Sequence, residues 1–160
     1  MPASRTGIGY DSHRLVEGRP LILGGQRIPF EKGLLGHSDA DAVAHALTDA
    51  ILGAAAAGDI GKLFPDTDPQ WKGADSIKLL FEACQLVRYR GFTPRQCDIT
   101  VILERPKLGS HFTAMAETLS EATGIPVSAI GLKAKTNEGM GFVGRGEGIA
   151  VIAVATLEEA

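Results

Sequence analysis

The feature that most constrains this chain is an alanine-rich segment, Asp39 to Ala57, which has a helical pattern and contains no Lys, Arg or Glu. A helix at a protein surface normally carries long charged side chains along its outer face. A helix without them is expected to be covered on most sides, so the rest of the chain must fold around it. Ser38 is its predicted N-cap, and Gly58 is its predicted stop.

Three polar residues interrupt this apolar segment, and they follow a helical spacing. Asp41, His45 and Asp49 lie at i, i+4 and i+8, which places them on one face of the predicted helix. Polar side chains in a covered helix need partners, because burying them without hydrogen bonds is unfavourable. We therefore expect this face to line a functional site.

The segments around this helix alternate between strand and helix patterns. Strands are predicted over 6–13, 97–103, 132–136 and 149–157, and a hairpin is predicted around Gly24 and Gly25. Two further helices are predicted over 74–90 and 108–123, the second ending at Gly124. This order predicts an α/β fold, an α+β sandwich with three main helices on one face of a four- to five-stranded mixed sheet, in one domain over 1–160.

Charge and hydropathy exclude several classes of protein. The net charge of −3 argues against a nucleic-acid partner, which would require a basic face. The longest apolar run, 148–157, is about half of what a membrane span needs, and the N-terminus lacks the apolar core of a signal peptide. The two cysteines, Cys84 and Cys97, have no disulfide or metal spacing and suit a reducing compartment. We expect a cytoplasmic protein without nucleic-acid or membrane partners.

One motif suggests a dinucleotide site and does not fit one. Residues 139–144 match G-x-G-x-x-G, but in a dinucleotide-binding fold this motif opens a helix. Here it is followed by Arg145 and then by a predicted strand, so the segment is interpreted as a loop between strands.

A metal site is predicted from two segments. Asp11 and His13 are two residues apart on a predicted strand, so their side chains leave the same face. Alone, such a pair can also be a surface ion pair. His45 in the covered helix adds a third potential ligand, its ring oriented by Asp49 or by a backbone carbonyl. Three ligands leave a fourth position open, as in catalytic zinc sites.

Other polar segments are candidates for binding the substrate. His37 and Ser38 precede the long helix, whose free N–H groups could help to bind an anion; His37 could equally be an exposed loop residue. The acidic loop over 59–68 could hold hydroxyl groups or a second cation, or be only a polar loop. Lys107 and Thr136 follow predicted strands and could contact a phosphate, or serve as solvated residues.

Together these motifs resemble the 2-C-methyl-D-erythritol 2,4-cyclodiphosphate synthase family of the non-mevalonate isoprenoid pathway. The resemblance covers nearly the whole chain. It is carried by G-Y-D-S-H at 9–13, the long run G-L-L-G-H-S-D-A-D from residue 33 to the P-D-T-D-P at 65–69, E-R-P-K-L at 104–108, K-T-N-E at 135–138 and G-R-G-E-G at 144–148.

The resemblance implies a role for each matching residue. Asp11, His13 and His45 match ligands of a divalent metal, with Zn²⁺ the expected ion and Mg²⁺ or Mn²⁺ a possible second one. His37 and Thr136 match the catalytic pair that stabilises the transition state, and Ser38 matches a phosphate contact. The methylerythritol pocket is matched by Asp59, Ile60, Gly61, Phe64, Pro65, Asp66, Thr67 and Asp68. The nucleotide and diphosphate side is matched by Leu103, Pro106, Lys107, Leu108, Gly109, Ala134, Lys135, Asn137, Glu138, Phe142 and Arg145.

The implied activity is a lyase reaction that cyclises 4-diphosphocytidyl-2-C-methyl-D-erythritol 2-phosphate and releases CMP. The family is a homotrimer with active sites between subunits. Two alternatives use the same residues. One is a metal-dependent phosphohydrolase that activates water, and the other is a zinc-stabilised trimeric scaffold that binds isoprenoid diphosphates without a reaction.

Overall fold

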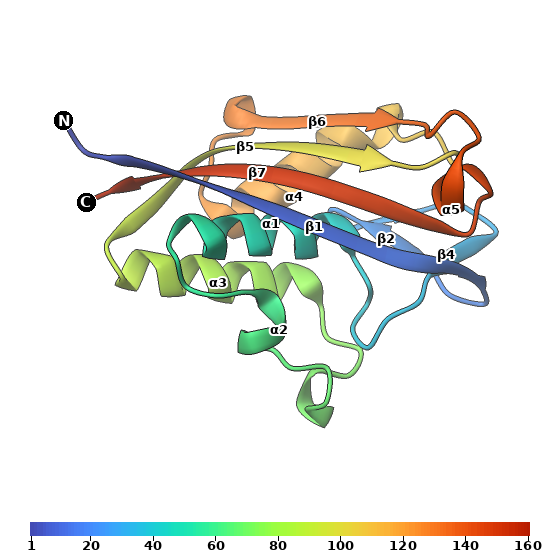
Figure 1. Cartoon of the computed structure of the whole chain (residues 1–160), viewed down its shortest axis with the longest axis horizontal. Coiled ribbons are helices and arrows are strands. Elements are labelled where there is room, and N and C mark those ends of the chain that lie inside the picture. The colour runs from blue at the N-terminus through green and yellow to red at the C-terminus, as the bar shows by residue number, and fades with distance from the viewer.

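The computed structural model describes residues 1–160 and contains one five-stranded mixed sheet (Figure 1). Its strand order is β4-β1-β7-β5-β6, in which only the β5–β6 pair is parallel. The strands are β1 (Ser4–Glu17), β4 (Lys32–Leu34), β5 (Phe92–Ile102), β6 (Ile130–Lys135) and β7 (Gly148–Glu159). The predicted hairpin is confirmed: β2 (Leu21–Leu23) and β3 (Gln26–Ile28) pair around Gly24 and Gly25, which both have positive φ.

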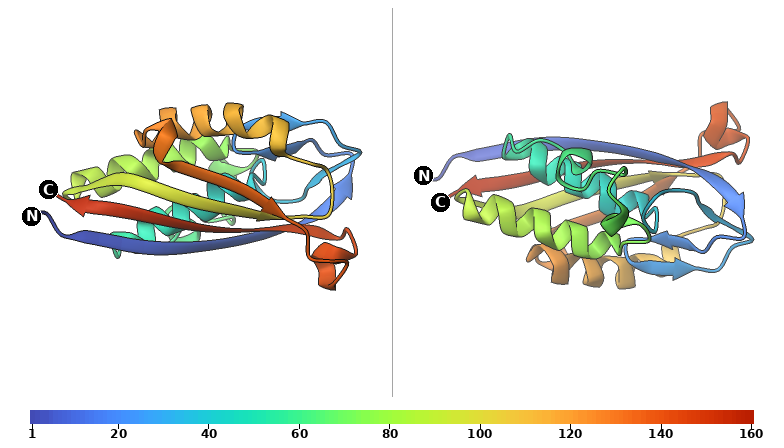
Figure 2. Two further views of the ribbon diagram at one scale, coloured as in Figure 1. Left: turned by 90° about the horizontal axis from the view of Figure 1, so that it is seen from above. Right: turned by 90° about the horizontal axis from the view of Figure 1, so that it is seen from below.

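Three main helices cover one face of this sheet, as predicted (Figure 2). They are α1 (Ala42–Ala54), α3 (Ser76–Tyr89) and α4 (Phe112–Thr123), and α1 packs on β1 and β7. The connections contain the short helices α2 (Ile60–Leu63) and α5 (Gly141–Gly144). They also contain the 3₁₀ turns η1 (Pro69–Trp71), η2 (Gly109–His111) and η3 (Val127–Ala129). No helix is both long and apolar enough to cross a membrane.

The long helix is covered as expected, but it is shorter than predicted at both ends. Its N-cap is Asp41 and not Ser38; the Asp41 side chain is fully buried and accepts hydrogen bonds from Ala44, Gly24 and Gly25 N–H groups. Asp41 therefore precedes the helix and joins it to the β2–β3 hairpin. The helix ends at Ala54, before Gly58, because Ala56 adopts a left-handed conformation (φ 53°).

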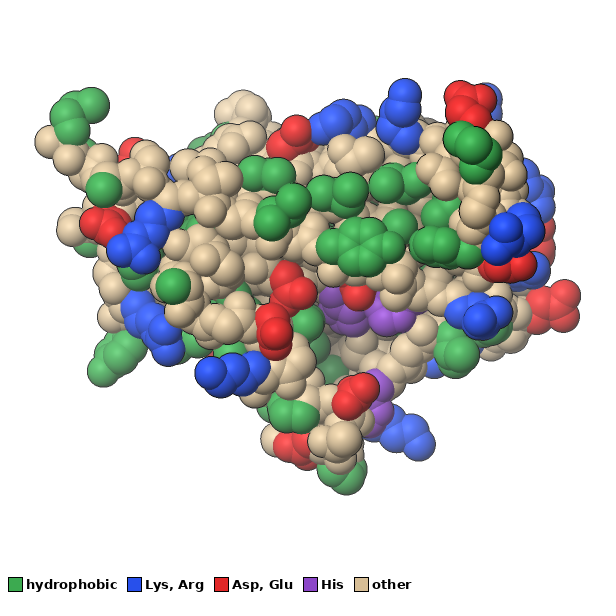
Figure 3. Space-filling view, in the orientation of Figure 1, with side chains coloured by type: hydrophobic (Ala, Val, Ile, Leu, Met, Phe, Trp, Pro, Cys, Tyr) green, Lys and Arg blue, Asp and Glu red, His purple; other side chains and the backbone are tan.

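The sheet face that carries no helix is partly apolar. Ile8, Tyr10 and Ile152 are 70%, 55% and 37% exposed, and Tyr10 pairs directly with Ile152 across β1 and β7. Figure 3 shows apolar side chains along the middle of this face, above a hollow in which histidine side chains are visible. Side chains at alternate positions of β1, including Asp11 and His13, point to the other face, toward α1.

Candidate metal centre and active site

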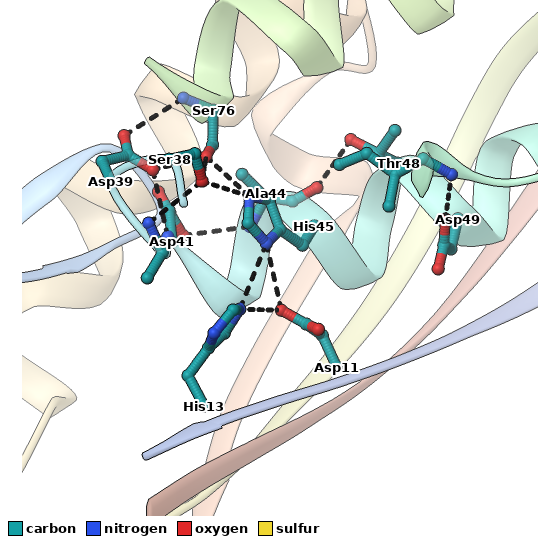
Figure 4. A network of polar contacts seen from close by, with 12 residues as sticks. Asp11, His13, Ser38, Asp39, Asp41, Ala44, His45, Thr48, Asp49 and Ser76 are labelled. Carbon is teal, nitrogen blue, oxygen red and sulfur yellow. Dashed lines mark hydrogen bonds and ion pairs between the residues drawn. The ribbon is translucent and has the colours of Figure 1, made fainter. Parts of the chain in front are cut away.

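Asp11, His13 and His45 converge, as the strand and helix spacings predict. Asp11 Oδ2 lies 2.8 Å from His13 Nε2 and 3.1 Å from His45 Nδ1, and these two nitrogens are 3.3 Å apart. All three ligand atoms fall within 4.8 Å of one another (Figure 4). Two come from β1 and one from α1, so the packing of this helix on this strand forms the cluster.

The donor set fits a divalent metal such as zinc, because one carboxylate oxygen and two imidazole nitrogens face a common point. The remaining nitrogen of each ring has its own partner. His13 Nδ1 lies 2.9 Å from the Leu35 carbonyl oxygen, and His45 Nε2 lies 2.7 Å from Ser76 Oγ. Such partners orient metal-binding imidazoles.

The prediction that Asp49 or a backbone carbonyl orients His45 is wrong. Serine hydroxyls occupy that position, and Asp49 instead accepts a 2.7 Å hydrogen bond from the backbone N–H of Ile60. Asp49 lies one further turn along α1, where its carboxylate reaches the start of α2 and not the imidazole. Its physical role is to hold the acidic loop against the end of α1.

Contacts within the cluster shift the pKa values of Asp11 and His13. Burial alone would raise the pKa of Asp11, but hydrogen bonds from His13 and His45 outweigh it and lower that pKa. Burial alone would lower the pKa of His13, but the hydrogen bond and charge of Asp11 raise it above its usual value. Without a metal, the Asp11 carboxylate is thus paired with His13, an imidazole that takes up a proton more readily than usual.

A cavity of about 390 Å³ opens beside the cluster. His13 and His45 line it together with His37 and Ser38 and with part of the predicted methylerythritol loop, namely Ile60, Gly61, Phe64, Pro65 and Asp66. Three residues that the sequence analysis did not single out also line it: Gly36, Trp71 and Leu79. The Trp71 ring meets the Phe64 ring edge to face at 5.0 Å and forms one apolar wall.

The remaining residues of this loop shape it and do not line the cavity. Asp59 is the N-cap of α2 and accepts a 2.9 Å hydrogen bond from the Lys62 N–H. Asp68 caps η1, and its carbonyl oxygen lies 3.1 Å from His37 Nε2, while Thr67 is exposed between them. Since a carbonyl only accepts, His37 Nε2 carries the hydrogen, and this bond joins His37 to the loop.

The predicted nucleotide-binding residues lie elsewhere, at the end of β6 and in the segments that follow β5 and β6. Leu103 N–H donates a 2.9 Å hydrogen bond to the Lys135 carbonyl, which aligns the two segments. Glu104, absent from the predicted site, joins them further by accepting hydrogen bonds from Asn137 N–H (2.7 Å) and Gly139 N–H (3.1 Å). The segments also contain Pro106, Lys107, Leu108, Gly109, Ala134, Thr136 and Glu138, of which Lys107 and Thr136 are exposed and Leu108 is buried. None of these residues lines the metal-side cavity.

Phe142 and Arg145 lie further along the connection between β6 and β7, which also contains Thr136 and Glu138. Phe142 is in α5, and Arg145 follows that helix and pairs with Glu147 at 3.1 Å. Arg145 lines a second cavity, of about 420 Å³, with Glu104 and Arg105. Phe142 lines a smaller cavity, of about 240 Å³, with the metal-cluster residue His13. The other predicted site residues form two sets, a metal side on β1 and α1 and a nucleotide side at the ends of β5 and β6.

Known proteins resemble this chain along nearly its whole length. The YgbB family model matches residues 4–158. A 2-C-methyl-D-erythritol 2,4-cyclodiphosphate synthase from Geotalea daltonii is 57% identical over 154 residues, covering 96% of this chain and 90% of that protein. A solved 2C-methyl-D-erythritol-2,4-cyclodiphosphate synthase in a CDP-bound form is 49% identical, with a TM-score of 0.88, covering 96% of this chain and 99% of that one. The bifunctional IspDF of Campylobacter jejuni is 44% identical with a TM-score of 0.96; the match covers 100% of this chain and 43% of that chain.

Proposed function

The chain belongs to the YgbB family, and on this premise we propose that it is a 2-C-methyl-D-erythritol 2,4-cyclodiphosphate synthase. Its substrate is 4-diphosphocytidyl-2-C-methyl-D-erythritol 2-phosphate. An oxygen of the 2-phosphate attacks the β-phosphorus of the cytidine diphosphate group and forms the new P–O bond. The bond from that phosphorus to the bridging oxygen breaks, and CMP leaves with the electron pair.

The observation that carries this proposal is the convergence of Asp11, His13 and His45 at a cavity that is also lined by His37 and the loop. Two phosphate groups must approach each other in an intramolecular attack, so their repulsion has to be offset. We propose Zn²⁺ at the three ligands; when bound, it neutralises phosphate charge beside the reacting groups. Mg²⁺ or Mn²⁺ is proposed as a second ion.

The chain's own residues then position the substrate and exclude water. His37 and Ser38 contact the 2-phosphate, and His37 with Thr136 stabilises charge that develops on the phosphoryl oxygens. The loop over 59–68 covers the methylerythritol. The Phe64–Trp71 pair forms an apolar wall of the cavity that keeps water away from the substrate. Because the attacking and leaving groups belong to one molecule, holding it folded supplies much of the rate enhancement.

We further propose that the active site is completed by a second copy of the chain in a homotrimer. The nucleotide-side residues do not line the 390 Å³ cavity beside the metal ligands, and only Phe142 shares a smaller cavity with His13. One copy therefore has no single pocket for both ends of the substrate. The uncovered sheet face supports the same proposal. Ile8, Tyr10 and Ile152 form an exposed apolar surface of the kind that subunit contacts bury.

Product analysis tests the proposed function. The protein is incubated with the substrate and Zn²⁺ and Mg²⁺, and the products are resolved by ³¹P NMR and chromatography. Cyclisation yields CMP and a cyclic diphosphate in equal amounts. Release of inorganic phosphate would indicate the hydrolase alternative, and an unchanged substrate with bound isoprenoid diphosphate would indicate the scaffold.

A further inference from the structure

His45 can be neutral in two tautomers, and only one of them can bind a metal at this site. Its Nδ1 faces the cluster, 3.1 Å from Asp11 Oδ2 and 3.3 Å from His13 Nε2. Its Nε2 faces away, toward Ser76 Oγ at 2.7 Å. A neutral imidazole has one N–H and one lone pair, so a ligating Nδ1 requires the hydrogen on Nε2.

The immediate surroundings of the ring allow either tautomer. With the hydrogen on Nδ1, His45 would donate to Asp11 and accept a hydrogen bond from a serine hydroxyl. With the hydrogen on Nε2, it would donate to that hydroxyl and leave Nδ1 free. A hydroxyl both donates and accepts, so Ser76 alone does not decide between the two. Ser38 Oγ, at 3.2 Å from Nε2, has the same ambiguity.

Asp39 removes the ambiguity at Ser76, the nearer of the two hydroxyls. Its Oδ1 accepts the hydrogen of the Ser76 hydroxyl, and its Oδ2 lies 3.1 Å from the Ser76 backbone N–H. A carboxylate only accepts, so the hydroxyl hydrogen of Ser76 points to Asp39 and a lone pair points to His45. We propose that Asp39 and Ser76 form a positioning relay, Nε2–H of His45 to Ser76 to Asp39, which holds His45 in the metal-binding tautomer.

The relay is largely buried and lies where two segments of the chain are joined by backbone hydrogen bonds. Ser76, the first residue of α3, is fully buried, as is most of His45. Two backbone hydrogen bonds join the same two segments: Asp39 N–H donates to the Ala74 carbonyl at 3.1 Å, and Gly73 N–H donates to the His37 carbonyl at 2.8 Å. Asp39 and Ser76 are therefore held beside each other by backbone contacts as well as by their own hydrogen bonds, and Ser76 in turn contacts His45 (Figure 4).

The tautomer of His13 is fixed by a backbone group instead. Its Nδ1 lies 2.9 Å from the Leu35 carbonyl, which can only accept, so its Nε2 lone pair faces the cluster. No side-chain substitution removes that carbonyl. Of the two imidazoles, His45 is the one whose tautomer depends on side chains, and the relay is accessible to mutation.

The inference rests on the proposed metal site and predicts how tightly that site binds. Partners of this kind typically contribute 10- to 100-fold to metal affinity. We expect Ser76→Ala to weaken Zn²⁺ binding by about that factor and Asp39→Asn to weaken it by about 10-fold, since the amide can still accept one hydrogen bond. Both variants should remain folded, because the Asp75 cap of α3 is retained.

The experiment measures Zn²⁺ dissociation constants by competition with a chelator for the wild type, both relay variants, His45→Ala and a control. The control is Thr48→Val, which removes a fully buried hydroxyl in α1 that donates to the Ala44 carbonyl and lies outside the relay. Ring ¹⁵N chemical shifts of His45 in the metal-free proteins report the tautomer directly. Supporting results are an Nε2–H ring in the wild type, a mixed population in Ser76→Ala, and weakened binding only in the relay variants and His45→Ala.

Two outcomes overturn the relay and distinguish it from the site itself. If Ser76→Ala and Asp39→Asn bind Zn²⁺ as the wild type does while His45→Ala does not, the metal site stands and the relay is wrong. If the wild type and His45→Ala bind Zn²⁺ equally, the metal site is wrong and the relay is wrong with it. An Nδ1–H ring in the metal-free wild type also contradicts the relay.

Discussion

Gly9 of β1 lies directly against the backbone of Ala46 of α1, so closely that a Cβ at Gly9 would be 1.9 Å from the Ala46 carbonyl oxygen. Gly7 has the same relationship with Ala50, at 2.0 Å. Glycines at these alternate positions let the helix rest on the strand without side chains between them. This close approach brings His45, next to Ala46, within hydrogen-bond distance of Asp11, two residues from Gly9.

Replacing Gly9 with Ala should therefore damage both stability and the metal site. The added methyl group meets backbone atoms that cannot rotate away, so we expect a loss of about 3 kcal/mol in the free energy of unfolding and weaker Zn²⁺ binding. Urea unfolding and metal content measure the two effects.

Gly53→Ala is the matched control for Gly9→Ala. It adds the same methyl group to α1 where the nearest atom, the Ile8 carbonyl oxygen, is 3.9 Å away, and should gain up to about 1 kcal/mol from helix propensity. Equal stability of Gly9→Ala and the wild type would contradict the proposed role of the close contact.

Asp41 stabilises the fold by joining α1 to the β2–β3 hairpin. In Asp41→Ala the helix loses its N-cap, worth about 1 kcal/mol. The buried N–H group of Gly24 loses its acceptor, at about 1–3 kcal/mol, and the more exposed N–H group of Gly25 loses its acceptor as well. Asp41→Ser keeps a hydroxyl that can cap the helix and should be intermediate. Chemical denaturation ranks the three proteins; equal stability of the Ala and Ser variants would show that the cap contributes little.

The burial of α1 could be predicted because its sequence contains no long charged side chain to face solvent. The Asp11–His13 pair could be predicted because the alternation of side chains along a strand is local. The separate roles of the three polar residues of the α1 segment could not be predicted. Asp41, His45 and Asp49 share one helical spacing, yet they serve as a helix cap, a candidate ligand and an anchor for the Ile60 N–H. Spacing gives the face of a helix, whereas the role depends on what another segment places there.

Ser76 illustrates what sequence patterns do not reveal. It is 31 residues from His45, and a serine at the start of a helix is ordinarily explained by capping preferences. Its contact with His45 depends on how α3 packs beside α1, which no local pattern encodes. Glu104 is similar, because it joins two loops 33 residues apart.

The Asp11–His13 pair predicts a pH dependence in the metal-free protein. The pKa of His13 is raised above 6.5. Its contribution to the free energy of unfolding is therefore complete below that pH and is lost as pH rises through the folded-state pKa. The pKa of Asp11 is lowered below 3.8. Its contribution to the free energy of unfolding is therefore present above that pH and is lost in stronger acid. The pair should stabilise the fold most between about pH 4 and 6.5.

Asp11→Asn tests this window after removal of metal with a chelator. The variant should lose more unfolding free energy at about pH 5.5 than at about pH 8.5, because only the lower pH has a charged His13 to pair with. In a His13→Ala background the same substitution should show a smaller change with pH. A loss that grows toward pH 8.5 would contradict the pairing.

His37 should matter for turnover and not for metal binding. Its side chain lines the cavity but lies outside the ligand cluster, so His37→Ala should retain Zn²⁺. Losing one preorganised donor should lower kcat by about 100- to 1,000-fold. His37→Gln, which can still donate a hydrogen bond, should recover part of that loss. Turnover close to the wild type in His37→Ala would leave His37 as only a contact to the Asp68 carbonyl.

The proposed sharing of the active site between subunits predicts complementation between two inactive variants. One variant, His45→Ala, lacks a metal side, and the other, Lys107→Ala with Thr136→Ala, lacks a nucleotide side. The two are mixed in equal amounts, unfolded together and reassembled, so that subunits combine at random. A working site needs an intact metal side, with probability about one half, next to an intact nucleotide side, also about one half. Activity should therefore return to about a quarter of that of the wild type.

The control for this experiment is the same mixture without unfolding, which should recover little activity because subunits have not exchanged. Wild-type protein carried through the same unfolding and reassembly gives the reference value, and each variant alone should remain nearly inactive. If the site lay within one chain, every chain in the mixture would carry one lesion and no activity would return. Absence of recovery after verified mixing would thus contradict the shared site while leaving the assignment of Asp11, His13 and His45 as metal ligands unaffected.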